Sequence, residues 1–285
     1  MNRHLLSRLV TAGLLTLAAA GAGLATAAPA AAVPGLDFQV GHSGFDSVAE
    51  KSATATCAAG TRVLGGGASI TGADSHVHLT RLQPNGSFDT YVAVAVERAP
   101  YAGSWRVSAY AICGDEPAGL EYVSFHTATD SEGYKTATAT CSGTKKLVGL
   151  GARTLGGNGQ VVIDDIMPSG TLGWVTVTAY EVQGGFAGDW SMWAYGVCAD
   201  PLPGLELRTA SGTPIDSTDE TVSVGCPAGK QVHGVGGMLS GGLGQVSYRG
   251  VYPLVGLDSA TVVALEDPDG YANNWYSRVY AICAS

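Results

Sequence analysis

One ten-residue pattern occurs three times in this chain and ends on a cysteine each time. The three copies are SWRVSAYAIC at 104–113, DWSMWAYGVC at 189–198 and NWYSRVYAIC at 274–283. In every copy a Trp lies eight residues before the Cys and a Tyr lies three residues before it. In an extended strand, residues eight apart share a face, and the Tyr lies on the opposite face. The pattern predicts three copies of one β unit, each closed by an equivalent strand.

The six cysteines follow the same repeat, with two in each copy. An even number of cysteines arranged in this way is typical of disulfides in an exported protein rather than of metal sites. Each bond would close a loop of nearly sixty residues and contribute about 4 kcal/mol of stability in the chain-entropy model. The expected pairs are Cys57 with Cys113, Cys141 with Cys198, and Cys226 with Cys283.

Period-two alternation within each copy predicts strands and no helix. KSATATC, KTATATC and ETVSVGC alternate small or apolar residues with polar ones, and each is followed by a glycine-containing apolar segment. Glycine inside a strand marks a bulge or the close approach of another backbone. The expected fold is all-β, with three tandem disulfide-stapled β-sandwich-like repeats. The alternative is a β-prism-like pseudo-threefold arrangement of three sheets.

The chain divides into a leader and three repeats. Residues 1–32 have arginines, then an apolar run, then small residues, which is the pattern of a secretory signal peptide cleaved after Ala27 or Ala32. Segments that combine Pro, Gly, Leu and an acid mark the starts of the units, so the repeats are expected at 35–115, 119–200 and 204–285. No later segment is apolar for long enough to span a membrane. The mature protein is therefore expected to be secreted and extracellular.

The charge of the chain limits its partners. The formal net charge is −9 at pH 7, and cleavage of the leader would remove two arginines and no acid. An acidic surface repels phosphate backbones and anionic lipid, so a nucleic-acid partner is not expected. No cofactor or metal is expected either. His76 and His78 in DSHVHL are interpreted as an exposed pair rather than as ligands, because the other repeats lack them.

A Glu, an aromatic residue and the Trp recur in register around the loop before each closing strand. Aromatic rings stack on sugar C–H faces, and a carboxylate accepts hydrogen bonds from hydroxyls, so this set is a candidate for three-site carbohydrate binding. The structural alternative is that the Trp packs on the disulfide and the Glu holds the loop backbone. The candidate residues are Glu97, Tyr101 and Trp105, then Glu181, Phe186 and Trp190, then Glu266, Tyr271 and Trp275.

The pattern C-x-x-G-[KT]-x-V-x-G-x-G with a terminal A-Y-A-x-C resembles that of extracellular repeat modules in secreted actinobacterial proteins. CPAGKQVHGVGG and VYAICAS in the third repeat carry the resemblance most clearly. The resemblance implies secretion and the module boundaries, and it implies no activity.

These observations favour a secreted, non-catalytic β-repeat protein that binds carbohydrate or cell-envelope glycan. The sequence contains no G-x-S-x-G, H-E-x-x-H or P-loop motif. The first alternative is an extracellular protein-binding or structural module, such as a protease inhibitor or an envelope component. The second is a hydrolase, which requires a His with both a nucleophile and an acid within hydrogen-bond reach.

Overall fold

The computed structural model describes residues 33–213 and 219–285, and the expected signal peptide, 1–32, lies outside the described residues. The described chain is built from strands, with one short 3-10 turn at Asp74–His76. The first six strands are β1 Asp37–His42, β2 Glu50–Thr56, β3 Arg62–Gly72, β4 Val77–Pro84, β5 Thr90–Glu97 and β6 Trp105–Gly114. The next six are β7 Glu121–His126, β8 Tyr134–Thr140, β9 Lys146–Leu155, β10 Val161–Pro168, β11 Trp174–Glu181 and β12 Ser191–Ala199. The last six are β13 Glu206–Ser211, β14 Asp219–Gly225, β15 Gln231–Ser240, β16 Val246–Pro253, β17 Ser259–Glu266 and β18 Tyr276–Ala284.

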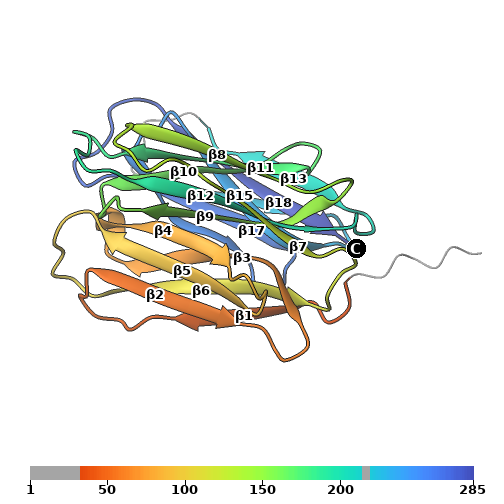
Figure 1. Ribbon diagram of the computed structural model, residues 1–285. Coiled ribbons are helices and arrows are strands. Elements are labelled where there is room, and N and C mark those ends of the chain that lie inside the picture. Colours follow the sequence, from red (N-terminus) through yellow and green to blue (C-terminus); the bar gives the residue numbers. More distant parts are fainter. Residues whose placement is uncertain (1–32, 214–218) are drawn as a thin grey trace, which may run out of the picture.

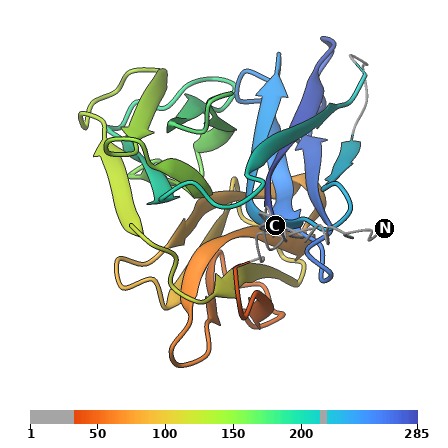
Figure 2. The same ribbon diagram turned by 90° about the vertical axis from the view of Figure 1, so that its right-hand side faces the viewer.

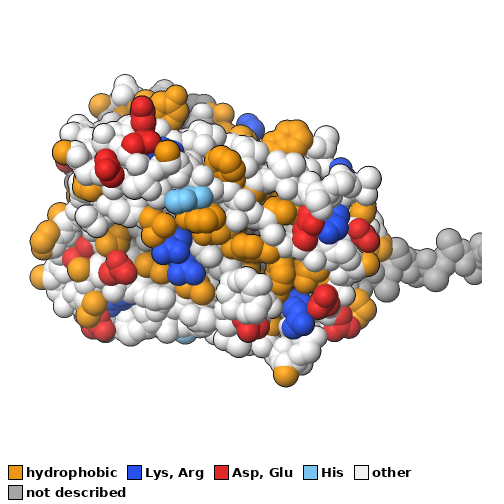
Figure 3. All heavy atoms as spheres, viewed as in Figure 1, with side chains coloured by type: hydrophobic (Ala, Val, Ile, Leu, Met, Phe, Trp, Pro, Cys, Tyr) orange, Lys and Arg blue, Asp and Glu red, His pale blue; other side chains and the backbone are white. Residues whose placement is uncertain are grey.

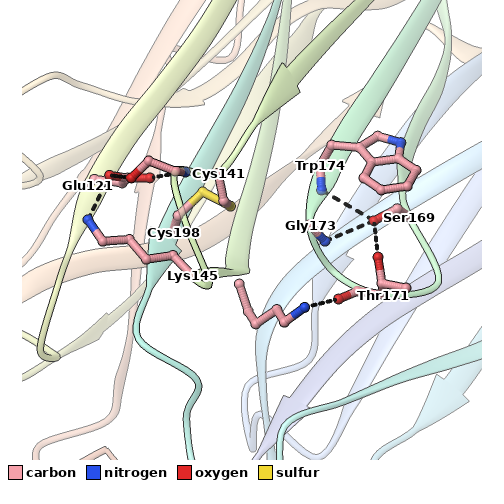
Figure 4. Close-up of a disulfide and its surroundings, with 10 residues drawn as sticks. Glu121, Cys141, Lys145, Ser169, Thr171, Gly173, Trp174 and Cys198 are labelled. Atoms are coloured by element: carbon pink, nitrogen blue, oxygen red, sulfur yellow. Dashed lines mark hydrogen bonds and ion pairs between the residues drawn. A yellow bond between two sulfur atoms is a disulfide. The ribbon is translucent and has the colours of Figure 1, made fainter.

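Each repeat is a two-layer sandwich closed by its disulfide. In the first repeat, β1, β6 and β3 form one layer, and β2, β5 and β4 form the other. Small residues let the layers approach: along β2 the alternate residues Ala53 and Ala55 are buried. The predicted disulfide pairs are confirmed, with Cα–Cα distances of 5.6, 5.8 and 5.7 Å. The close-up in Figure 4 shows the second pair, Cys141–Cys198, beside the Glu121–Lys145 ion pair of 2.6 Å.

The sandwiches share their sheets. Both layers of each repeat pair with layers of the other two repeats, which gives three six-stranded antiparallel sheets. Sheet I is β1-β6-β3-β16-β17-β14, sheet II is β2-β5-β4-β9-β12-β7, and sheet III is β13-β18-β15-β10-β11-β8. Figure 1 shows the strands lengthwise, and Figure 2 shows the three repeats gathered around a common centre. The all-β fold of three stapled repeats is thus confirmed, and the threefold alternative describes how those repeats assemble.

Glycines allow β3, β9 and β15 to meet around the pseudo-threefold axis. A Cβ on Gly65 would overlap the carbonyl oxygen of His233, and one on Gly149 would overlap that of Leu64. Around the same ring, a Cβ on Gly234 would lie 2.5 Å from the carbonyl oxygen of Val148. Each repeat therefore supplies one glycine that faces the backbone of the next. These are among the strand glycines for which the sequence predicted a bulge or a close backbone approach.

The loops that follow β5, β11 and β17 also meet at one end of the axis. Arg98, Val182 and Asp267 occupy equivalent positions in the three repeats and line one cavity of about 360 Å³. Arg98 Nη1 lies 3.4 Å from Asp267 Oδ2, and both side chains are largely buried. Arg98 Nη2 also donates to the Gly244 carbonyl at 2.9 Å. The first and third repeats are therefore joined by charge as well as by strand pairing.

No helix in residues 33–213 or 219–285 is long and apolar enough to span a bilayer.

His78 corrects the expectation of an exposed histidine pair. The side chain is fully buried in β4, whereas His76 lies in the preceding 3-10 turn and stacks on Tyr101. The two histidines therefore lie in different elements and do not form an exposed pair. Burial, and then the nearby Arg98 charge, lower the pKa of His78 to about 3.

His78 is therefore expected to make the fold sensitive to acid. Between pH 6.5 and pH 3, His78 is protonated in the unfolded chain, where its pKa is about 6.5, but stays neutral in the folded protein. The free energy of unfolding therefore decreases as pH falls from about 6.5 towards 3. The loss due to this residue should be about 2 kcal/mol between pH 6.5 and pH 5. His78→Val, which installs the residue of the equivalent position Val162, should reduce that loss. Urea unfolding at the two pH values measures it, and an unchanged pH dependence in the variant would contradict the assignment.

Candidate functional site

The predicted Glu and Trp residues form one internal link in every repeat. In the first repeat, Glu97 Oε1 accepts from Trp105 Nε1 at 3.1 Å, and Glu97 Oε2 accepts from the Tyr101 backbone N–H at 3.0 Å. Glu181 accepts from the Trp190 indole at 3.0 Å and from the Phe186 backbone at 2.7 Å. Glu266 does the same with the Trp275 indole at 2.8 Å and the Tyr271 backbone at 3.1 Å.

The tryptophans of the link are fully buried, whereas the burial of the other aromatic residue differs between repeats. The three Trp side chains are 0, 0 and 1% exposed. The third aromatic, Tyr271, is 7% exposed and donates through its hydroxyl to the Gly241 carbonyl at 2.7 Å. Tyr101 and Phe186 are half-buried, and a Cβ on Gly103 or Gly188 would overlap the ring two residues before it. Ring surface for a ligand is thus left mainly in the first two repeats.

In two repeats the amino group of a buried lysine lies over the ring of the Trp. Lys51 Nζ lies 4.7 Å from the centre of the Trp105 ring and donates to the Trp105 carbonyl at 2.6 Å. Lys135 Nζ lies 4.8 Å from the Trp190 ring and forms an ion pair with Asp130. Sequence reasoning missed these lysines, although each lies in phase with the inward Ala and Cys of its strand. They reinforce a structural role for the Trp, and ligand binding by these loops stays a prediction.

A second candidate site lies on the outer face of sheet II, where a row of register partners crosses all six strands. On β2, β5, β9 and β12 its members alternate with buried residues, so they point away from the core, and register pairing places the residues of β4 and β7 in the same row. From β2 to β7, the sheet II row consists of Ser52, Val94, Arg81, Arg153, Trp193 and His126. Figure 3 shows this face in the orientation of Figure 1, with hydrophobic side chains beside basic side chains and a histidine.

Aromatic side chains extend the row along β12 and β7. The His126 and Trp193 rings stack at 4.3 Å and 11°, and the Trp193 and Tyr195 rings are nearly parallel at 5.8 Å and 2°. Tyr122 stacks on Tyr195 at 5.5 Å, and Phe88 meets Tyr122 edge-on at 5.9 Å. Contacts of this kind fix the rings in place before any ligand arrives. The result is a packed aromatic cluster on two neighbouring strands, in which Tyr195 is buried, Trp193 and Tyr122 are half-buried and His126 is exposed.

The two arginines of the row are direct cross-strand neighbours from different repeats. Within residues 33–213 and 219–285, no carboxylate forms an ion pair with Arg81 or Arg153. Arg81 Nε is buried and has no hydrogen-bond partner. Burial, and then the Arg153 charge, lower the pKa of the Arg81 guanidinium. Both side chains line a cavity of about 220 Å³ between β5, β4, β9 and the turn at 156–159.

The equivalent rows on the other two faces lack this set. The row of sheet I, from β14 to β1, contains Thr221, Val263, Gly250, Ser69, Ser108 and His42. The row of sheet III, from β8 to β13, contains Thr136, Thr178, Asp165, Met238, Arg278 and Ser211. The same scaffold thus accepts small, polar or acidic residues at these positions. The arginine pair and the Trp of sheet II are not required by the fold.

Sequence reasoning missed this face because it searched for residues that recur. The available signal was the opposite: Trp193 stands where the closing strands of the other repeats have Ser108 and Arg278. Arg81 and Arg153 are far apart in the sequence, and only the pairing of β4 with β9 places them side by side.

Histidine and serine meet at two places that bear on the hydrolase alternative. His42 Nδ1 lies 2.8 Å from Ser108 Oγ, and His126 Nε2 lies 3.0 Å from Ser191 Oγ. Neither histidine has a carboxylate partner in the part of the chain that the structure describes, so a His–Ser–acid set is not formed there. The same described residues hold no group of three or more His, Cys, Asp or Glu that could bind a metal ion. No protein-family model matches the chain, and no curated protein matches it significantly.

Proposed function

We propose that this chain is a secreted, non-catalytic protein that binds extracellular glycan through the outer face of sheet II. The observation that carries the proposal is the aromatic and arginine row, which one of three equivalent faces has and the fold does not require. Aromatic surface suits the C–H faces of sugar rings, and guanidinium and hydroxyl groups suit their oxygen atoms. The three disulfides fit an oxidising compartment outside the cytosol.

The test is binding of the mature protein to a glycan array and to insoluble polysaccharides. Trp193→Ser, which copies Ser108 of sheet I, should weaken binding at least tenfold, because it removes the centre of the ring stack. The matched control is Trp174→Ser on sheet III, where the indole is 43% exposed and lies outside the row. Its binding should equal that of the wild type.

Two further results would contradict the proposal in different ways. Absence of binding to every glycan by the folded protein would reject glycan binding itself. Loss of binding in Tyr101→Ala and Phe186→Ala, with Trp193→Ser unaffected, would place the site at the loops before the closing strands.

An extracellular protein is the second candidate partner. Trp, Tyr and Arg are enriched among the residues that dominate protein–protein interfaces, and the sheet II face holds all three. Capture from culture supernatant that depends on Trp193, together with an empty glycan array, would favour this candidate.

A further inference from the structure

The cavity lined by Arg81 and Arg153 bears on which class of glycan the sheet II face would bind. Register pairing places Arg81 directly opposite Arg153, and like charges in this position repel each other across the strands. The buried Arg81 Nε lacks a protein acceptor, and no carboxylate of the described residues neutralises either guanidinium. An anion bound between the two guanidinium groups would relieve the repulsion between their charges.

We propose that this cavity binds the carboxylate of a uronic-acid residue within an acidic polysaccharide, because the arginine pair supplies local positive charge on a chain whose net charge is negative. The inference rests on the proposed function, because it names the ligand class of the same face. Guanidinium groups bind carboxylates through paired N–H donors, and two neighbouring guanidinium groups can hold both oxygens of one carboxylate.

The size and lining of the cavity favour a sugar acid over a bare inorganic anion. Its volume of about 220 Å³ lies below that of pockets for drug-sized ligands, which suits one residue of a longer chain. Val94 and Val96 supply apolar wall, and Thr80 supplies a hydroxyl. Glu50 is exposed at the cavity and can accept a hydrogen bond from a sugar hydroxyl. The neighbouring Trp193 would contact the next residue of the polysaccharide.

The position of the cavity between two repeats also bears on specificity. Arg81 comes from β4 of the first repeat, whereas Arg153 and the turn at 156–159 come from the second. Sheets I and III place Gly250 opposite Ser69 and Asp165 opposite Met238 at the same crossing. One such site per molecule is therefore expected, so that binding should have a stoichiometry of one.

The experiment compares one sugar backbone with and without its charge. Calorimetric titration of the mature protein uses short oligogalacturonates and the same oligomers as methyl esters. The acidic oligomers should bind at least tenfold more tightly than the esters. Arg153→Met, which copies Met238, should remove that preference, and Arg153→Lys should retain part of it, because Lys keeps the charge and loses the paired donors. Arg208→Met, at an exposed arginine of β13, is the matched control and should bind as the wild type does.

Each outcome separates this inference from the proposed function. Equal binding of acid and ester, weakened by Trp193→Ser and unaffected by Arg153→Met, would reject the carboxylate site and leave glycan binding in place. Binding of duplex DNA or inorganic polyphosphate as tightly as of oligogalacturonate would show a general anion site and would overturn the inference. No binding of either oligomer, with binding of another glycan on the array, would also reject it. No binding of any glycan would reject both proposals.

Discussion

Gly149→Ala is expected to destabilise the fold by about 3 kcal/mol, because overpacking at this position cannot be relieved by a side-chain movement. The added Cβ would overlap the Leu64 carbonyl oxygen and would crowd Gly65, both of which belong to the backbone of β3. Separation of β9 from β3 would disturb the contact of both strands with β15 on the axis. Urea unfolding followed by tryptophan fluorescence measures the loss.

Gly86→Ala is the matched control for this substitution. No atom lies within 4 Å of a Cβ built on Gly86, which lies in an exposed turn. The control should unfold within about 0.5 kcal/mol of the wild type, as surface substitutions usually do. If Gly149→Ala unfolded at the same urea concentration as Gly86→Ala, the axial packing described here would be wrong.

Glu97→Ala is expected to lower stability by about 3 kcal/mol, because two buried N–H donors would lose a charged acceptor. The Trp105 indole is fully buried, and the loop backbone at Tyr101 has the same carboxylate as its partner. Thermal and urea unfolding should both show the loss.

Two variants test whether the loss arises from the hydrogen bonds. Glu97→Gln keeps one acceptor oxygen and replaces the other with a donor, so its loss should be smaller than that of the alanine variant. Glu116→Ala removes an exposed carboxylate that pairs with the exposed Arg62, and it should change stability by less than about 1 kcal/mol. Equal stability of Glu97→Ala and Glu116→Ala would contradict the role of the link.

Recurrence in the sequence was sufficient to predict the features that every repeat needs. The Cys pairs, the close approach at the strand glycines and the structural alternative for Glu and Trp all follow from residues that must repeat if the unit repeats. Local alternation also identified β2 and β6, because one face of each strand packs on the other layer. These features are local or lie within one unit, so the pattern of one chain contains them.

The pairing of strands between repeats could not be predicted in this way. β3 pairs with β16 over a short stretch, Gly250 with Ser69 and Val251 with Ala68. No residue type in either strand identifies the other as its pairing partner. The sheet II row depends on that kind of pairing, since β4 and β9 belong to different repeats. The candidate site is therefore formed by tertiary structure, from residues such as Arg153 and Trp193 that depart from the repeat.

The shared sheets also determine what one unit can be on its own. Cut out of the chain, the first repeat would present β3 and β4 as open edges, whose partners in the intact protein are β16 and β9. Open edges of this kind favour association with other chains. Because each repeat offers one edge of the β3 type and one of the β4 type, three identical copies would pair these edges in a closed ring with cyclic symmetry. The linkers between the repeats thus join in one polypeptide what is geometrically a homotrimer, and this leaves each of the three faces free to carry different residues.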